Sequence, residues 1–395
     1  MTMTTAEQVR SYSGPAILSF GFRPFFLSAG IWAALTVAIW MPMLAGQVAL
    51  PTAFGPIEWH THELIYGFVP AAVAGFLLTA VPNWTGRLPV TGTPLLALFL
   101  IWISGRVAIS ISDWIGAPLA AAIDLSFLVA VGAVAAREII AGRNIRNLKV
   151  LAAVALLIVG NVVFHAEVLW GIWYGYGARI GISAAILLIM LIGGRIIPSF
   201  TRNWLVRQEP GRLPVPFSKF DVAIMLISGC ALVSWIVVPE SDLTALLTVA
   251  AGIANAVRLA RWAGERTVSE PLVLVLHVAY AFVPVGFLLV AIAIWRPDVV
   301  TMSGALHGWT VGAIGLMILA VMTRASLGHT GRPLTATLPI TMTYAAVAMA
   351  GIARIIAAFD IAREPMLHLS ATAWVLGFAG FAIIYAPILM KPRLA

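Results

Sequence analysis

The stretch Trp59-His60-Thr61-His62-Glu63 leads into an apolar span that ends in Val81-Pro82-Asn83-Trp84-Thr85-Gly86-Arg87. A second span keeps its spacing, because His307, Gly312 and Arg332 are separated by the same intervals as His62, Gly67 and Arg87. An apolar-embedded histidine at a fixed distance from a Thr-Gly-Arg turn is hard to obtain twice by chance. We therefore interpret residues 59–106 and 304–354 as copies of one structural unit.

The composition excludes a soluble globular protein. The chain has 395 residues, of which 61% are hydrophobic and only 10% charged. One soluble core cannot hide so much apolar surface, because most of the surface of a soluble protein must face water. Apolar runs long enough to cross a bilayer recur along the whole length. We expect an all-α, polytopic membrane bundle of about twelve transmembrane helices, forming a single domain over residues 1–395.

The expected spans follow one another with short connections. We place them, within a few residues, at 25–44, 60–81, 95–111, 119–136, 150–171, 179–198, 221–238, 243–259, 271–294, 301–323, 337–358 and 366–390. The duplicated unit corresponds to the second and tenth spans. The sixth starts on the same side and ends near Gly193-Gly194-Arg195, which suggests a four-helix repeat present three times.

Basic residues mark alternate loops. The loops after even-numbered spans hold most of them, for example Arg137, Arg143 and Lys149, whereas loops after odd-numbered spans hold acids such as Asp113 and Glu240. By the positive-inside rule, both termini are cytoplasmic and the odd-numbered loops lie on the other, periplasmic side of the membrane. Topology thus explains the formal charge of +8, and no nucleic-acid partner is expected.

Cys230 is the only cysteine in the chain. A single cysteine excludes an internal disulfide, a thiolate zinc site and covalent haem attachment through Cys-x-x-Cys-His. Any haem must therefore be a b-type haem, held without a covalent bond by histidine.

The histidines are the candidate metal ligands, and the topology sorts them by depth. Five of the seven fall toward the periplasmic ends of their spans, and His368 among them is expected to be structural. The other four form the predicted metal site: His60, His62, His165 and His307. A single histidine in a membrane helix is more often an interhelical hydrogen-bonding partner than a ligand. Four at one depth favour ligation of copper or of a second iron.

His60 and His62 can share one ion in only one backbone conformation. In a helix, two residues turn the side chain by about 200°, so the pair cannot chelate. In an extended segment, residues i and i+2 share a face. Pro56 just upstream favours the extended form, from which we expect a His-Thr-His chelate. The alternative is that one histidine caps the helix.

Three further polar side chains accompany these histidines. Asn161 lies four residues before His165 and is expected to hydrogen-bond its ring. Glu63 and Glu167 are carboxylates near the hydrocarbon boundary and are candidate proton donors. Solvation at the level of the lipid headgroups explains Glu167 equally well.

The candidate cofactor-binding residues are cations and the deeper histidines. Three arginines lie within spans: Arg106, Arg195 and Arg354. They are expected to bind haem propionates or a carboxylate partner, with snorkelling to the cytoplasm as the alternative for Arg195. His277 and His329 lie toward the cytoplasm and are candidate haem-binding residues. Tyr280, one turn after His277, is a candidate catalytic phenol or the hydrogen-bonding partner of that imidazole.

The chain resembles the NnrS family of bacterial haem- and copper-containing membrane proteins linked to nitric oxide, over nearly its full length. The resemblance rests on short motifs in a specific order: Phe22-Arg23-Pro24-Phe25-Phe26, Trp59-His60-Thr61-His62-Glu63, Gly75-Phe76-Leu77-Leu78-Thr79-Ala80-Val81-Pro82-Asn83-Trp84, Gly193-Gly194-Arg195-Ile196-Ile197-Pro198, Leu276-His277 with Tyr280, Met322-Thr323-Arg324, and Gly328-His329-Thr330-Gly331-Arg332.

The resemblance implies a membrane protein that holds haem and copper and protects cells from nitric oxide, often alongside denitrification. It assigns no ligand residue by residue. We expect an oxidoreductase that reduces nitric oxide to nitrous oxide with quinol-derived electrons. Two alternatives stay open: a haem protein that binds or senses nitric oxide without turnover, and a small-molecule transporter, which would favour broken helices and midplane polar residues.

Overall fold

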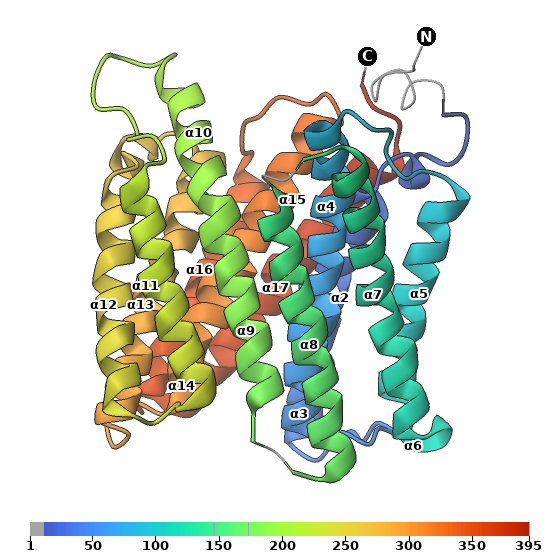
Figure 1. The fold of residues 1–395 in the computed structure, drawn as a ribbon, viewed down its shortest axis with the longest axis vertical. Coiled ribbons are helices and arrows are strands. Elements are labelled where there is room, and N and C mark those ends of the chain that lie inside the picture. Colours follow the sequence, from blue (N-terminus) through green and yellow to red (C-terminus); the bar gives the residue numbers. More distant parts are fainter. Residues whose placement is uncertain (1–11, 145–146, 173, 395) are drawn as a thin grey trace. The chain divides into compact units, whose positions relative to one another are not determined.

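The computed structural model describes residues 12–144, 147–172 and 174–394. Within these residues the chain forms helices and connecting loops and contains no strand. Twelve helical stretches are long and apolar enough to cross a membrane (Figure 1). The predicted all-α membrane bundle is therefore confirmed.

Each predicted span corresponds to one helical stretch. In chain order they are α2 (Phe22–Leu44), α3 with η2 and α4 (Pro56–Thr85), α5 (Thr93–Ser110), α7 (Ala117–Ala141), α8 (Leu148–Trp170), α9 with η4 and α10 (Tyr176–Leu205), α11 (Lys219–Val237), α12 (Asp242–Ala260), α13 (Pro271–Trp295), α14 with η6 and α15 (Met302–His329), α16 (Leu338–Ala358) and α17 (Arg363–Met390). The short helices η1 (Ala16–Leu18), α6 (Ser112–Ile115) and η5 (Gly264–Thr267) lie in the connections.

The chain divides into two compact units. As far as they are described, residues up to 184, 322–333 and those from 381 onward form the first unit, and residues 185–321 and 334–380 form the second. Both units consist of spanning helices and their connections, so neither contains a separate soluble domain among the described residues.

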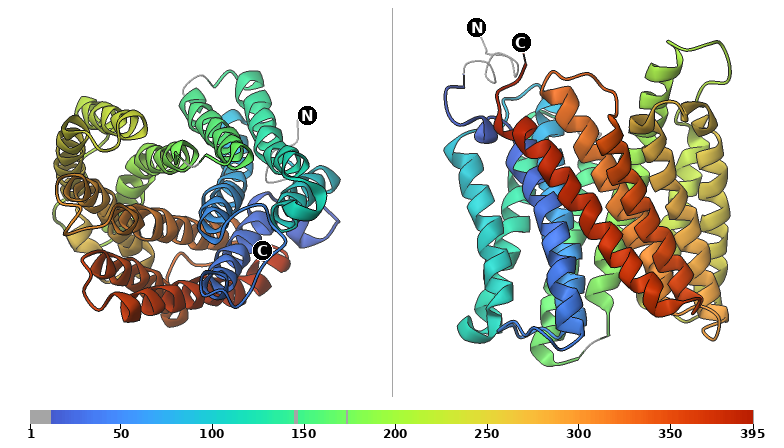
Figure 2. Two further views of the ribbon diagram at one scale, coloured as in Figure 1. Left: turned by 90° about the horizontal axis from the view of Figure 1, so that it is seen from below. Right: turned by 180° about the vertical axis from the view of Figure 1, so that it is seen from behind.

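In the first unit, α4 is the central helix. It packs against α2 and α7, and α7 packs in turn against α5 and α8. The most apolar part of the Pro56–Thr85 span is 78% buried, against 39% for α2, which agrees with this central place. Arg23 at the start of α2 donates from Nη1 to the carbonyl oxygens of Leu389 (2.8 Å) and Lys391 (2.7 Å), joining the end of α17 to this unit (Figure 2).

In the second unit, α13 is the central helix. It packs against α12, against α14 with η6, and against α16, while α11 packs on α12. The most apolar part of α13 is 72% buried, against 33% for α11. Its neighbours therefore enclose most of α13.

Three spans contain a π-helical segment. The helix widens at η2 (Glu63–Phe68), η4 (Ile189–Gly193) and η6 (Gly308–Gly315). Such segments are rare and frequently mark functional sites. The first follows His62 directly and the third follows His307 directly, so both predicted copies of the repeat carry the segment in the same register. The threefold repeat stays a prediction, and the shared segment is a second observation in its favour.

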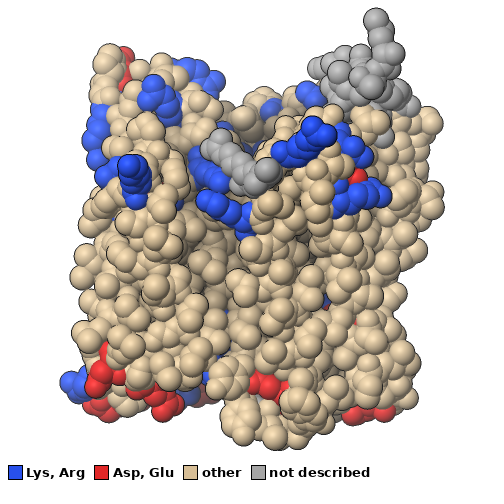
Figure 3. All heavy atoms as spheres, viewed as in Figure 1, with Lys and Arg blue, Asp and Glu red and all other residues tan. Residues whose placement is uncertain are grey.

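Charged side chains separate along each unit. On the face drawn in Figure 3, basic side chains gather at one end of each unit and acidic side chains gather at the other. This distribution follows the alternation of basic and acidic loops along the sequence.

Candidate metal centre

Four helices of the first unit carry polar side chains to a similar depth. His62 lies six residues after the start of α3, and Asp124 lies seven residues after the start of α7. Arg106 lies four residues before the end of α5, and His165 lies five residues before the end of α8. At 1.5 Å per residue, these positions are about 6–10 Å from the helix ends. All four side chains are buried, with at most 4% of each residue exposed.

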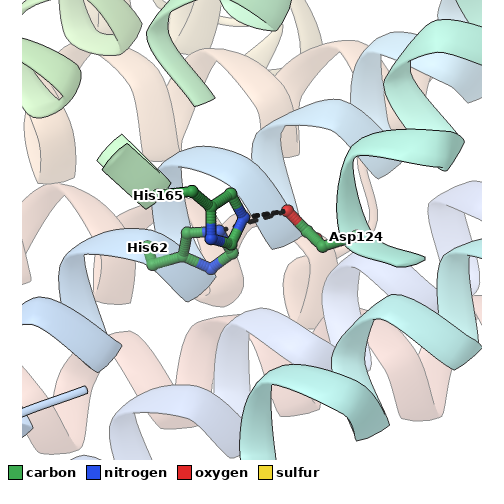
Figure 4. Close-up of side chains that lie close together, drawn as sticks. All are labelled: His62, Asp124 and His165. Atoms are coloured by element: carbon green, nitrogen blue, oxygen red, sulfur yellow. Dashed lines mark hydrogen bonds and ion pairs between the residues drawn. The ribbon is translucent and has the colours of Figure 1, made fainter. Parts of the chain in front are cut away.

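Asp124 lies between two imidazole rings. Its Oδ2 is 3.2 Å from Nε2 of His62 and 3.0 Å from Nε2 of His165. Figure 4 shows the two rings beside this carboxylate. One possible ligand atom from each residue lies within 4.8 Å of the others. Two imidazoles and one carboxylate at this spacing suit a transition metal such as iron or copper.

Arg106 bridges two buried carboxylates. Its Nη1 donates to Oε2 of Glu63 at 2.5 Å, and its Nη2 donates to Oδ1 of Asp124. Buried charges are costly unless they are paired, and one guanidinium cannot balance two carboxylates. A cation beside Asp124, either a metal ion or a proton on a histidine, would neutralise the remaining negative charge.

Glu63 orients the His62 ring. Its Oε1 is 3.1 Å from Nδ1 of His62, while its Oε2 also accepts a hydrogen bond from Nε1 of Trp32 at 2.8 Å. A carboxylate on one ring nitrogen fixes the orientation of a histidine ligand, because the other nitrogen then points at the metal. The geometry therefore gives Glu63 a positioning role, and its role as a proton donor stays a prediction.

Asn161 completes the cluster from α8. Its Nδ2 donates to Oδ2 of Asp124 at 2.7 Å, and its Oδ1 is 3.1 Å from Nε2 of His62. The expected hydrogen bond to His165 was wrong, since the amide faces α3 and α7 instead. Both nitrogens of His62 thus face acceptor oxygens and are placed to donate protons. A metal ion at Nε2 would take the place of one of these protons.

Gly67, in the π-helical segment η2, makes room for this packing. A Cβ atom on Gly67 would lie 2.5 Å from Nη1 of Arg106 and 2.9 Å from Oε2 of Glu63. The Gly67 carbonyl accepts a hydrogen bond from Nε1 of Trp102 at 3.0 Å. Gly67 is one of the residues that define the sequence repeat. Only glycine fits at this position, because the buried ion pair of Arg106 and Glu63 comes so close to its backbone.

The comparison with protein families covers this whole cluster. The family model described as NnrS protein matches residues 16–393. The chain belongs to the NnrS family. Among curated proteins, none matches it. NnrS proteins are membrane proteins implicated in the response to nitric oxide, and the family suggests metal or haem binding, which agrees with a buried group of two histidines and one aspartate.

Sequence reasoning found part of this NnrS cluster. The structure brings together His62, Glu63, His165 and Arg106. Arg106 was predicted to bind either a haem propionate or a carboxylate side chain, and it pairs with two carboxylates here. Asp124 was missed. Its signal was present, because it is a single carboxylate within the apolar span predicted at 119–136, where an ionisable residue is a functional candidate by default.

His60 does not join the cluster. Residues Pro56–His62 are helical, so the expected extended His-Thr-His segment was wrong. Proline suits the first helical position, where its missing N–H is not needed. The helix turns His60 away from His62, and the His60 ring stacks on Trp40 with 4.0 Å between centroids. These two histidines therefore do not chelate one ion.

Glu167 connects α8 to the start of α9. Its Oε1 accepts from the backbone N–H of Tyr176 at 2.8 Å, and its Oε2 accepts from that of Gly177 at 3.2 Å. A carboxylate is stabilising at a helix N-terminus, where the backbone N–H groups are unpaired. Only 6% of Glu167 is exposed, so the alternative of headgroup solvation was wrong. Its catalytic role stays a prediction.

A second polar network lies within the second unit around Arg258. This arginine is fully buried and donates to Oδ1 of Asp221 (2.9 Å), the hydroxyl of Tyr280 (3.0 Å) and the carbonyl of Met190 (3.1 Å). The tyrosine donates in turn to Oδ1 of Asn255 at 2.7 Å. Arg258 lies in the last turn of α12, within the span predicted at 243–259.

The other predicted site residues of the second unit are His277, His307, Arg195 and Arg354. Among the described residues, none of them belongs to a group of possible metal ligands. Nε2 of His277 is 2.8 Å from Oγ1 of Thr201, so its alternative pairing with Tyr280 was wrong. Nδ1 of His307 is 2.6 Å from the Ser303 carbonyl oxygen. Arg195 and Arg354 are half-buried. The cofactor and metal roles of these residues stay predictions.

His329 belongs to the first unit. Its ring lies 5.7 Å from that of Phe20 and 5.5 Å from that of Phe22, between centroids. The aromatic motif at the start of α2 therefore packs against the end of α15. A haem-binding role for His329 stays a prediction.

Proposed function

We propose that this NnrS-family chain reduces nitric oxide to nitrous oxide at a metal ion held by His62, Asp124 and His165. In this reaction two nitric oxide molecules, two protons and two electrons give one nitrous oxide and one water. The observation that supports it most is the buried group of two imidazoles and one carboxylate in a family implicated in the nitric oxide response. A copper or iron ion bound there would supply a redox-active Lewis acid.

The chain's own residues would prepare the site. Trp32 holds the Glu63 carboxylate, Glu63 holds the His62 ring, and Arg106 holds the Asp124 carboxylate, so the ligands need little rearrangement on binding. Pre-organised ligands of this kind favour the binding of a metal and the placement of a substrate. Apart from the buried ion pairs the spans are apolar, which suits a neutral, lipid-soluble gas, whereas a charged substrate would need a polar path.

Electrons are proposed to come from a membrane quinol through a b-type haem. The lone cysteine leaves histidine as the haem ligand. His277 in the second unit and His329 in the first unit are proposed as separate candidate haem-binding residues. Nδ1 of His277 is buried and has no hydrogen-bond partner among the described residues, which supports a further ligand at this ring. A quinol is proposed because it reaches a membrane-embedded site from the lipid phase.

The orientation proposed for the chain puts both termini in the cytoplasm of a bacterium. It rests on the basic loops after even-numbered spans. Reporter fusions after Gly142 and after Glu240 are expected to lie on opposite sides of the inner membrane. Two fusions reporting the same side would contradict this topology.

Turnover is the direct test of the proposed function. Purified protein loaded with metal and haem, supplied with a reduced quinol and nitric oxide, is expected to consume the gas and release nitrous oxide. Asp124→Asn is expected to lower the rate by at least about tenfold, because it removes a ligand. Asp113 is exposed, and Asp113→Asn is expected to leave the rate unchanged. Stoichiometric binding without nitrous oxide would instead support a protein that binds or senses nitric oxide.

A transporter is supported less well. The helices that contain η2, η4 and η6 widen without breaking, so each span stays helical from end to end. Transporters of lipid-insoluble substrates use broken helices with exposed backbone at the binding site. We therefore retain the redox proposal.

A further inference from the structure

The loop between α2 and α3 buries one aromatic side chain. Residues 45–49, Ala53 and Gly55 of this loop are exposed, whereas only 5% of Phe54 is exposed. An exposed connection normally keeps a large apolar side chain inside for a reason of packing or function.

The Phe54 ring lies directly against both predicted ligand histidines. Its centroid is 5.3 Å from that of His62 and 5.9 Å from that of His165, and it stacks on Phe164 at 6.2 Å. His62 lies six residues into α3, about 9 Å from the start of this helix, where the loop ends. Phe54 therefore covers the histidines on the side of this exposed loop.

Two hydroxyl groups fasten the loop in place. Oγ1 of Thr52 donates to the Ile109 carbonyl at 2.7 Å and lies 3.1 Å from Oγ of Ser112. The same serine oxygen accepts from the backbone N–H of Ala53 at 2.9 Å, one residue before Phe54. Ser112 is fully buried, so these hydrogen bonds are shielded from water. We call Thr52 and Ser112 the clasp.

We propose that Phe54 is a gate that decides what reaches the metal centre, with the clasp holding it closed. This inference rests on the proposed metal site at His62, Asp124 and His165. A small neutral gas can reach the site through apolar packing. Hydrated ions and bulky chelators need the phenyl ring to move aside, because they cannot shed their water against an aromatic surface at low cost. Phe54 is thus a specificity-determining residue that keeps water and ions out.

The test measures how fast a chelator removes bound copper. Protein purified in detergent is loaded with Cu(II), its copper content is measured, and the loss of the Cu(II) signal is followed after addition of EDTA. Phe54→Ala is expected to bind the same amount of copper and to lose it at least about tenfold faster. Ser112→Ala keeps the ring but removes two hydrogen bonds of the clasp, and it is expected to accelerate the loss by about tenfold as well.

Val48→Ala is the matched control, since Val48 lies in the same loop but is 43% exposed. It should release copper at the wild-type rate. If Phe54→Ala is too unstable to purify, Ser112→Ala and Thr52→Val carry the test. Wild-type release rates in the variants that bind copper would overturn the gate. Copper loading unaffected by Asp124→Asn would instead contradict the metal site, and thus the proposed function.

Discussion

Asp124→Asn is expected to empty the metal centre of the first unit. Asp124 contacts both histidines, Asn161 and Arg106, so the substitution removes a ligand and the only negative charge shared by all of them. At known metal sites, loss of a residue that only hydrogen-bonds a ligand lowers the metal affinity by about 10–100-fold. Loss of this ligand is expected to lower it by more than about 100-fold. Metal content after equilibrium dialysis, together with competition titration, measures the effect.

Two variants separate a ligand from its surroundings. Glu63→Gln keeps the three ligands but weakens both the support of His62 and the ion pair with Arg106, so a smaller loss of about 10–100-fold is expected. Asp113→Asn removes an exposed carboxylate of the same unit and should leave the metal content unchanged. A folded Asp124→Asn protein with wild-type metal content would show that this cluster is a structural ion network and not a metal site.

Arg258→Met is expected to destabilise the second unit strongly. The substitution leaves the Asp221 carboxylate, which is 3% exposed, without its cation. Breaking one side of a buried ion pair costs about 3–5 kcal/mol, because the remaining charge is buried without compensation. Thermal denaturation in detergent is expected to show a clearly lowered Tm.

A double variant distinguishes charge from packing. Arg258→Met combined with Asp221→Asn removes both charges, and it is expected to be more stable than Arg258→Met alone. Arg212→Met breaks the exposed pair with Glu265, whose side chains are 52% and 59% exposed, and should change stability by less than about 1 kcal/mol. Equal Tm values for Arg258→Met and Arg212→Met would contradict a buried network around Arg258.

The sequence by itself determined the fold class and the order of the spans. Twelve apolar runs predict twelve helices because a bilayer leaves the backbone no other way to pair its polar groups. The depth of the site was also predictable, since residue position along a span translates directly into distance from its end. His62 and His165 were therefore placed at a common depth from their positions alone.

The tertiary structure decided which of these residues meet. Position along a helix says nothing about the direction in which neighbouring helices face, and this rotation selects Asp124 and His165 as partners of His62. The local backbone conformation determined where His60 lies, because the helix α3 turns its ring toward Trp40 and away from His62. The carboxylate of Asp124 and the phenyl ring of Phe54 acquire their places only when α3, α7, α8 and the loop before α3 pack together, and no periodicity within one span encodes that contact.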